Sequence, residues 1–243
     1  MKLTILGCQG PAMGPGGACS SYLVQHGGTN LLIDMGNGSL AELQRHIGLG
    51  DMDAIILSHL HHDHISDLFV WKYAIDIMRS RGAQIKRQTV FLPGTPAELA
   101  KLATTGDTFD VVYISDGAMY TIGELDIAFQ QVCHPVESYG VSVSAGGKRL
   151  VYSGDTNATA DLGPFVAGAD LFLADGGLLE RHGGEGAPHM TVREACQAGA
   201  EAAQTVVTHL SPLYTREEIA AELTGNSILA EQGQVFEMEH EAI

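Results

Sequence analysis

The amino-acid sequence predicts an α/β protein whose sheets and helices stack in layers. Most apolar runs are short and are bounded by Gly, Asp, Asn or Pro, which is typical of strands joined by tight connections. Several runs, such as Ala54-Ile55-Ile56-Leu57, are continuous rather than alternating, and this favours strands that are covered on both faces. Helical segments lie among the strands. Together these observations predict a layered sandwich that forms one domain over residues 1–243.

Each element has its own local signal. The predicted strands are 2–7, 20–24, 30–34, 54–58, 89–92, 110–114, 125–132, 149–153, 170–174, 205–209 and 234–237. The predicted helices are 39–48, 67–79, 96–104, 160–168, 191–203 and 215–223. Thr191 and Glu194 fit a capping box, in which each side chain binds a free backbone N–H of the first turn. Phe69 and Tyr73 are four residues apart, so we expect one core-facing helix face for both.

Composition excludes several classes of protein. Of the 243 residues, 45% are hydrophobic and 17% are charged, which describes a globular rather than a disordered chain. The formal charge of -16 opposes stable binding to long nucleic acid or to an anionic membrane. The start of the sequence lacks a signal-peptide pattern, and the four cysteines form no C-x-x-C pair. We therefore expect a cytoplasmic protein with reduced thiols and no membrane partner.

A cluster of histidines follows the apolar strand at 54–57. The segment Ser58-His59-Leu60-His61-His62-Asp63-His64 places five potential metal ligands at the strand end and, we expect, in a tight turn beyond it. Imidazoles this close would repel one another if several were protonated. A divalent cation could use the lone pairs of their neutral forms and of the carboxylate. The cluster therefore predicts a metal site.

This spacing, His-x-His-x-Asp-His after a hydrophobic strand, resembles the signature of the metallo-β-lactamase superfamily. The expected companions follow in order, each after an apolar strand: His134 in Val132-Cys133-His134-Pro135, Asp155 in Ser153-Gly154-Asp155-Thr156, and His209 in Val207-Thr208-His209-Leu210. The resemblance spans nearly the whole sequence. It implies a four-layer αββα sandwich with the metals at one edge, between the two sheets.

The resemblance also implies a ligand set for two divalent ions. His59, His61 and His134 would hold one ion; Asp63, His64 and His209 would hold the other; Asp155 would bridge them. Zinc is the expected metal, and manganese or iron would also suit these ligands. Such a pair lowers the pKa of bound water toward neutrality and supplies a bridging hydroxide as the nucleophile. Asp63 would also orient the attacking water.

Two further segments resemble the ribonuclease-Z-like phosphodiesterase branch. Gly186-Ala187-Pro188-His189-Met190-Thr191-Val192-Arg193-Glu194-Ala195 is similar to a His-Leu-Thr-x-x-Glu-Ala segment of that branch. By this resemblance His189 would protonate the leaving oxygen or bind a phosphate oxygen, and Glu180 would orient it. A purely structural interpretation, in which His189 only precedes the helix, competes with this one. The sequence has no room for the long arm with which ribonuclease Z grips transfer RNA.

The leading hypothesis is therefore a hydrolase of small anionic phosphodiesters, such as cyclic nucleotides or short oligonucleotides. Five basic residues between 72 and 87 could steer such a substrate, or could form an ordinary solvated helix face. Lactone or thioester hydrolysis on the same metals is the alternative activity. A metal-containing scaffold without turnover and an iron-dependent oxidoreductase are the remaining interpretations. By analogy with the branch, we also expect a homodimer.

Overall fold

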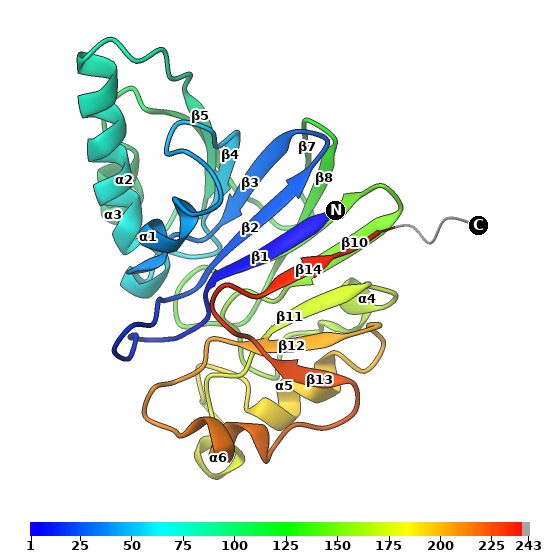
Figure 1. Cartoon of the computed structure of the whole chain (residues 1–243). Coiled ribbons are helices and arrows are strands. Elements are labelled where there is room, and N and C mark those ends of the chain that lie inside the picture. Colours follow the sequence, from blue (N-terminus) through cyan, green and yellow to red (C-terminus); the bar gives the residue numbers. More distant parts are fainter. Residues whose placement is uncertain (240–243) are drawn as a thin grey trace.

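The computed structural model describes residues 1–239 and consists of two facing sheets with helices on their outer sides (Figure 1). Each sheet has seven strands. Side chains from the inner faces of both sheets form one buried cluster, which includes Ile5, Val24, Val141 and Leu173. The predicted αββα sandwich is confirmed.

The first sheet has the order β14-β1-β2-β3-β4-β5-β6. Its strands are β1 (Lys2–Gly7), β2 (Ser21–His26), β3 (Thr29–Ile33), β4 (Ala54–Ile56), β5 (Gln88–Leu92), β6 (Phe109–Tyr113) and β14 (Val235–Glu237). The pairs from β14 to β3 are antiparallel, and the pairs from β3 to β6 are parallel. The continuous apolar runs of β3 and β4 are buried on both faces, as the sequence predicts.

The second sheet has the order β13-β12-β11-β10-β9-β8-β7. Its strands are β7 (Met119–Ile122), β8 (Leu125–Gln131), β9 (Tyr139–Ala145), β10 (Lys148–Tyr152), β11 (Leu171–Asp175), β12 (Thr205–Thr208) and β13 (Ser227–Leu229). It too is mixed, because β7 to β10 pair antiparallel whereas β10 to β13 pair parallel. The two sheets therefore share one plan: a meander followed by crossovers through helices.

Helices cover both outer faces. The first sheet carries α1 (Ser39–Leu43), α2 (His62–Ser80) and α3 (Ala97–Thr104), and the second carries α4 (Gly163–Val166), the 3₁₀ turn η1 (Glu180–His182), α5 (Val192–Ala198) and α6 (Arg216–Ala220). A separate apolar cluster lies under each group of helices. The predicted capping box of Thr191 and Glu194 is formed at α5. No helix within residues 1–239 combines the length and apolar composition needed to cross a membrane.

The sequence analysis missed three strands: β7, β9 and β13. The strand β9 has the sequence Tyr-Gly-Val-Ser-Val-Ser-Ala. Its small and polar residues give no strong apolar signal, although the strand is buried along most of its length. Helix α2 begins at His62, five residues before the predicted start at 67. Asp63 and His64 therefore lie in the first turn of a helix and not in a turn before it. A carboxylate in that turn also complements the helix dipole.

The core-facing side of α2 differs from the expected one. Its buried apolar residues include Leu68, Trp71 and Ile75, spaced three and four apart. Trp71 is 0% exposed, whereas Tyr73 is 67% exposed. Phe69 is partly buried at the margin of the same cluster. The pairing of Phe69 with Tyr73 as a core face was wrong, because the buried stripe is centred on Trp71.

Replacement of Trp71 by Ala is expected to destabilise the protein by about 3–5 kcal/mol, because it leaves a cavity beneath α2. The change also leaves the Leu49 carbonyl without its indole donor at 2.9 Å. Urea unfolding followed by circular dichroism measures the loss. Tyr73→Ala on the same helix is the matched control and should change the free energy of unfolding by less than about 0.5 kcal/mol. Equal losses in the two variants would contradict this assignment of the buried face.

Candidate metal centre

The candidate site lies where several strands end. Parallel strands point their carboxyl ends to the same edge of a sheet, and loops at that edge commonly hold ligands. His59 follows β4 in the first sheet, and Asp155 and His209 follow β10 and β12 in the second. His134 follows β8, which runs in the direction of β10 because both pair antiparallel with β9. The topology thus brings residues from 59 to 209 to one edge of the sandwich.

The predicted ligands lie together. In one group, single ligand atoms of His59, His61, His134 and Asp155 all lie within 4.8 Å of one another, and in a second group so do those of Asp63, His64 and His209. Asp155 stands between the groups: its Oδ2 atom is 3.6 Å from His59 Nε2 and 3.3 Å from His64 Nε2. Its Oδ1 atom is 3.4 Å from His209 Nδ1. This central placement is the one that a bridging carboxylate requires.

The donor atoms themselves fit cations. His64 Nε2, His209 Nε2 and Asp155 Oδ1 are buried and have no hydrogen-bond partner among the residues the structure describes. Buried polar atoms of folded proteins are almost always satisfied, so three unpartnered atoms in one cluster fit the binding of a cation. Burial lowers the pKa of His59 and of His209, and neighbouring histidines lower both further. Both imidazoles are therefore neutral and offer a lone pair to a divalent cation.

Asp34, at the end of β3, fixes the orientation of His64 and was missed in the sequence analysis. Its Oδ2 atom lies 2.8 Å from His64 Nδ1, which leaves Nε2 of that ring directed at the cluster. The same carboxylate accepts hydrogen bonds from the backbone N–H and the hydroxyl of Ser58 and from the Tyr152 hydroxyl, at 2.7, 2.8 and 3.1 Å. A carboxylate that holds a ligating histidine in one tautomer is a common outer partner of metal sites.

Backbone strain also gathers at the site. Asp34 and His209 have a φ of 57°, and no other non-glycine residue within 1–239 has a positive φ. Such conformations cost energy and are retained mainly where function needs them. Gly10 faces His209 so closely that a Cβ atom there would lie 2.0 Å from the imidazole. Gly10 is thus required for space, and no sequence motif indicates this role.

His189 lies beside the cluster, paired with a carboxylate other than the expected one. Its Nδ1 atom is 2.9 Å from Asp175 Oδ2 and 3.8 Å from Asp155 Oδ2. Burial alone would lower the pKa of His189, but the charge and hydrogen bond of Asp175 outweigh this and raise it to about 9. The imidazole therefore holds a proton at neutral pH.

The expected role of Glu180 is not supported by its position. Glu180 lies on η1 and is exposed. Its carboxylate accepts a hydrogen bond from the Thr191 hydroxyl at 3.2 Å. The expectation placed the acid after the strand end, whereas Asp175 is the last residue of β11 itself. An acidic residue at the end of an apolar strand, as at Asp155, is the signal that could have identified Asp175.

The basic residues between 72 and 87 are largely engaged elsewhere. Lys72 pairs with Asp76, Lys86 with Asp53, and Arg87 with Asp110. Arg79 donates to two backbone carbonyls of the loop after α2. These contacts match the solvated-face interpretation of this segment.

Asp34→Asn is expected to weaken metal binding by about 10–100-fold, the usual effect of losing an outer-shell partner. An amide keeps the volume of Asp34 but can accept through only one oxygen, so it cannot serve all four donors. Calorimetric titration of the metal-free protein with zinc, together with elemental analysis of the purified protein, measures the effect. Asp110→Asn on the exposed surface is the control. An unchanged zinc affinity in Asp34→Asn would contradict the assignment of Asp34 as the residue that orients His64.

Comparison with known proteins agrees with this geometry. The sequence profile of the metallo-β-lactamase superfamily matches residues 14–190, more than half of the chain. An uncharacterised protein of Mycobacterium leprae is 34% identical over 236 residues, which cover 91% of this chain and 82% of that protein. The probable metallo-hydrolase YhfI of Bacillus subtilis is 30% identical over 246 residues, covering 98% of this chain and 100% of YhfI.

Solved structures show the same fold. The crystal structure of YhfI superposes with a TM-score of 0.89 at 28% identity, covering 97% of this chain and 98% of that one. The short form of human tRNase Z superposes with a TM-score of 0.77 at 19% identity, covering 99% and 100% of the two chains. At that identity the likeness concerns the fold alone. The chain thus belongs to the metallo-β-lactamase superfamily and is a metal-dependent hydrolase.

Proposed function

We propose that this hydrolase cleaves small phosphodiesters, such as cyclic nucleotides or short oligonucleotides. The observation that carries the proposal is the pair of His189 and Asp175 beside Asp155, the central carboxylate of the cluster. A protonated imidazole in this position can donate a proton to a departing alkoxide or bind a phosphate oxygen. Hydrolysis of an ester with a poor leaving group needs such a donor.

The candidate ligands would hold two divalent ions: His59, His61, His134 and Asp155 around one, and Asp155, Asp63, His64 and His209 around the other. The ions would lower the pKa of water and stabilise negative charge on the phosphoryl group. Asp63, whose Oδ2 atom is 3.6 Å from His64 Nε2, would orient the attacking water. His189 would donate the proton on its Nε2 atom to the opposite, leaving oxygen, while its Nδ1–H stays hydrogen-bonded to Asp175.

Several finer expectations remain predictions. Zinc is the proposed metal, a cytoplasmic location the proposed compartment, and a homodimer the proposed assembly. The formal charge of -16 supports a small anionic substrate, held by metals, over a long nucleic acid held by a basic surface. Lactone or thioester hydrolysis is the alternative activity, because the same ligands can serve an acyl substrate.

The variant His189→Ala distinguishes phosphodiester hydrolysis from lactone hydrolysis. Loss of the proton donor should reduce diesterase activity by about 10²–10⁴-fold, while hydrolysis of a lactone should change little. The assays use 3′,5′-cyclic AMP, whose departing alkoxide is a poor leaving group, and a simple lactone with the same zinc-loaded sample, whose metal content is checked by elemental analysis. Parallel loss of both activities, or retention of diesterase activity, would rule out the proposed role of His189.

A pair of acidic variants tests which carboxylate serves His189. Asp175→Asn should lower diesterase kcat by at least about tenfold, because the imidazole loses the charge that keeps it protonated and oriented. Glu180→Gln should stay close to the native rate, since its side chain contacts Thr191 instead. Rates are measured at neutral pH and again at lower pH, where Asp175→Asn should partly recover. A larger loss of rate in Glu180→Gln than in Asp175→Asn would instead show that Glu180 orients His189, as the sequence analysis expects.

A further inference from the structure

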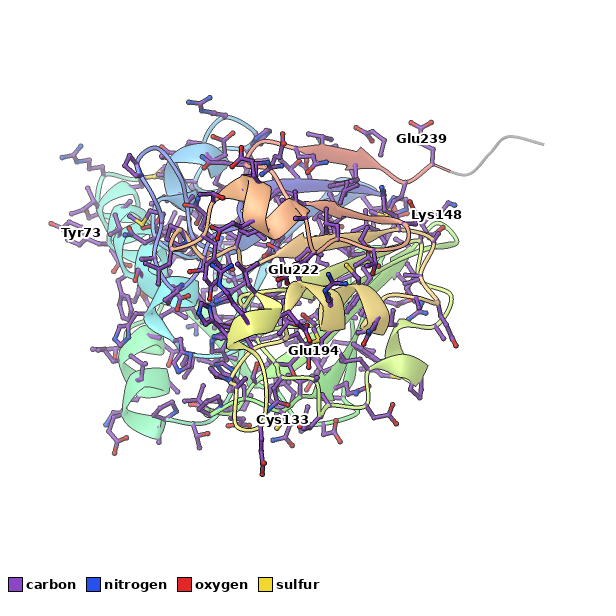
Figure 2. All side chains as sticks on the ribbon, turned by 90° about the horizontal axis from the view of Figure 1, so that it is seen from below. Tyr73, Cys133, Lys148, Glu194, Glu222 and Glu239 are labelled. Atoms are coloured by element: carbon purple, nitrogen blue, oxygen red, sulfur yellow. The ribbon has the colours of Figure 1, made fainter. Side chains whose placement is uncertain are left out.

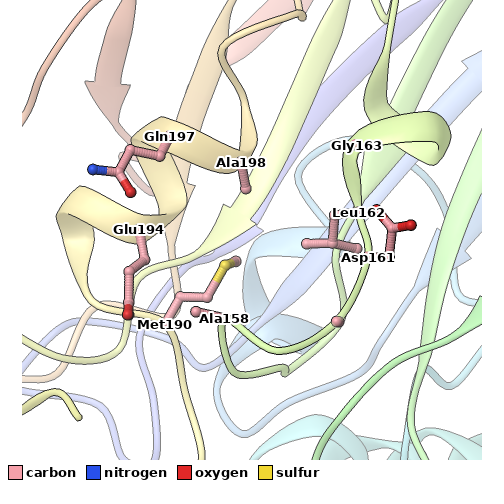
Figure 3. Close-up of a pocket in the computed structure, with 9 residues that line it drawn as sticks. Ala158, Asp161, Leu162, Gly163, Met190, Glu194, Gln197 and Ala198 are labelled. Atoms are coloured by element: carbon pink, nitrogen blue, oxygen red, sulfur yellow. The ribbon is translucent and has the colours of Figure 1, made fainter.

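One cavity opens beside His189, on the second sheet's side of the candidate metal centre, and a second cavity adjoins it. The inner cavity, of about 340 Å³, is lined by residues 157–159, 184–187, 189 and 194. The outer cavity, of about 290 Å³, lies between α5 and the segment that leads into α4 (Figure 3). Ala158 and Glu194 line both. Each volume is at the small end of the range for ligand sites, which suits one small molecule and not a polymer.

One residue that lines the inner cavity also contacts the candidate metal centre. His189 lines the cavity and at the same time contacts Asp175 and Asp155. The carbonyl of the preceding residue, Pro188, is 3.0 Å from His134 Nδ1. A substrate whose phosphate reaches His189 would therefore place its remaining part in this cavity.

The lining chemistry opposes a second phosphate. Apart from His189, the charged side chains that line the two cavities are Glu185, Glu194 and Asp161, and within residues 1–239 no Lys or Arg lines either. Acceptors without cations disfavour a phosphate and favour neutral groups that carry N–H donors. The charges thus direct the phosphate of the substrate to His189 and the metal centre, and its neutral remainder to the two cavities.

Glu194 is the best-placed acceptor. Its Oε2 atom accepts from the Thr191 backbone N–H at 2.8 Å, which holds the side chain in place as part of the capping box. Its Oε1 atom has no hydrogen-bond partner in the described part of the chain, and the residue is half-buried. Figure 3 shows the side chain extending from α5 beside Met190 and Ala158. In the view from below, Glu194 lies between the ends of the molecule marked by Tyr73 and Lys148 (Figure 2).

We propose that these cavities bind the nucleoside part of a cyclic nucleotide, and that Glu194 selects bases with an exocyclic amino group. The inference rests on the proposed diesterase function and specifies its substrate class. Adenine, cytosine and guanine carry such a donor, whereas uracil has a carbonyl oxygen where cytosine has its amino group, and a carboxylate repels that oxygen. The small residues Ala158, Gly184, Gly186 and Ala187 leave room for a flat ring.

The experiment compares zinc-loaded wild type with Glu194→Gln on 3′,5′-cyclic AMP, 3′,5′-cyclic UMP and the base-free diester bis(4-nitrophenyl) phosphate. Gln can replace Glu in a capping box, so the variant changes the charge while keeping the helix start. Wild type should prefer cyclic AMP to cyclic UMP. In Glu194→Gln, kcat/KM for cyclic AMP should fall by about tenfold, mainly through KM, as expected when a hydrogen bond to a charged acceptor is lost.

Glu218→Gln is the matched control. Glu218 closes the capping box of α6 with Thr215, and it lines neither cavity. The same substitution there should leave the ratio of cyclic AMP to cyclic UMP activity unchanged. Ala158→Phe is the second variant: Ala158 is exposed and lines both cavities, so a phenyl ring would fill them without disturbing the core. It should raise KM for both cyclic nucleotides by a larger factor than for the base-free diester, each of whose aryl rings is smaller than a nucleoside.

The outcomes are distinguishable. An equal ratio in wild type and Glu194→Gln, or cyclic nucleotide activity that Ala158→Phe leaves intact, would overturn the assignment of these cavities while the base-free diester still reports a diesterase. No activity on any of the three phosphodiesters would instead overturn the proposed function. A change of base preference in Glu194→Gln, absent from Glu218→Gln, would support the assignment.

Discussion

Strand direction is the constraint on which the site depends. Each sheet places a set of parallel strands next to a meander, so β3, β4, β8, β10, β11 and β12 all end at one edge of the sandwich. Residues that directly follow these ends are therefore neighbours, although they lie as far apart in the sequence as Asp34 and His209. The helices on the outer faces and the apolar layer between the sheets keep this edge fixed. Chemistry at the edge then needs only the right side chains at the strand ends.

The second requirement is to hold polar groups where little water reaches them. Asp34, His59, His64 and Asp155 are all buried, and an isolated charge in such a place is costly. The cluster meets this cost through mutual contacts: Asp34 serves Ser58, Tyr152 and His64, while Asp155 stands among the histidines. Three atoms of the cluster, His64 Nε2, His209 Nε2 and Asp155 Oδ1, have no hydrogen-bond partner among the described residues, and divalent cations would complete their coordination.

Much of this arrangement could be predicted from the sequence, and the gaps have physical reasons. The closely spaced histidines after an apolar strand are distinctive, so they indicated the metal cluster and, with His134, Asp155 and His209, the fold. A single acid after a strand, such as Asp34, looks like any turn residue. Asp175 and Glu180 are close in sequence, and only the path of the chain after β11 determines which of them meets His189. Strand β9 was missed because burial between two neighbours, and not its own apolarity, makes it a strand.

The hydrogen bond between Tyr152 and Asp34 joins the second sheet to the first across the sandwich, at 3.1 Å between hydroxyl and carboxylate. Through Asp34 it also joins both sheets to His64. Folding and cation binding are consequently linked equilibria: a cation that binds only the assembled cluster stabilises the native state in proportion to the logarithm of its free concentration. With a cation bound in this way, the thermal stability of the enzyme would depend on metal supply, and a cell poor in that metal would hold a less stable protein as well as a less active one.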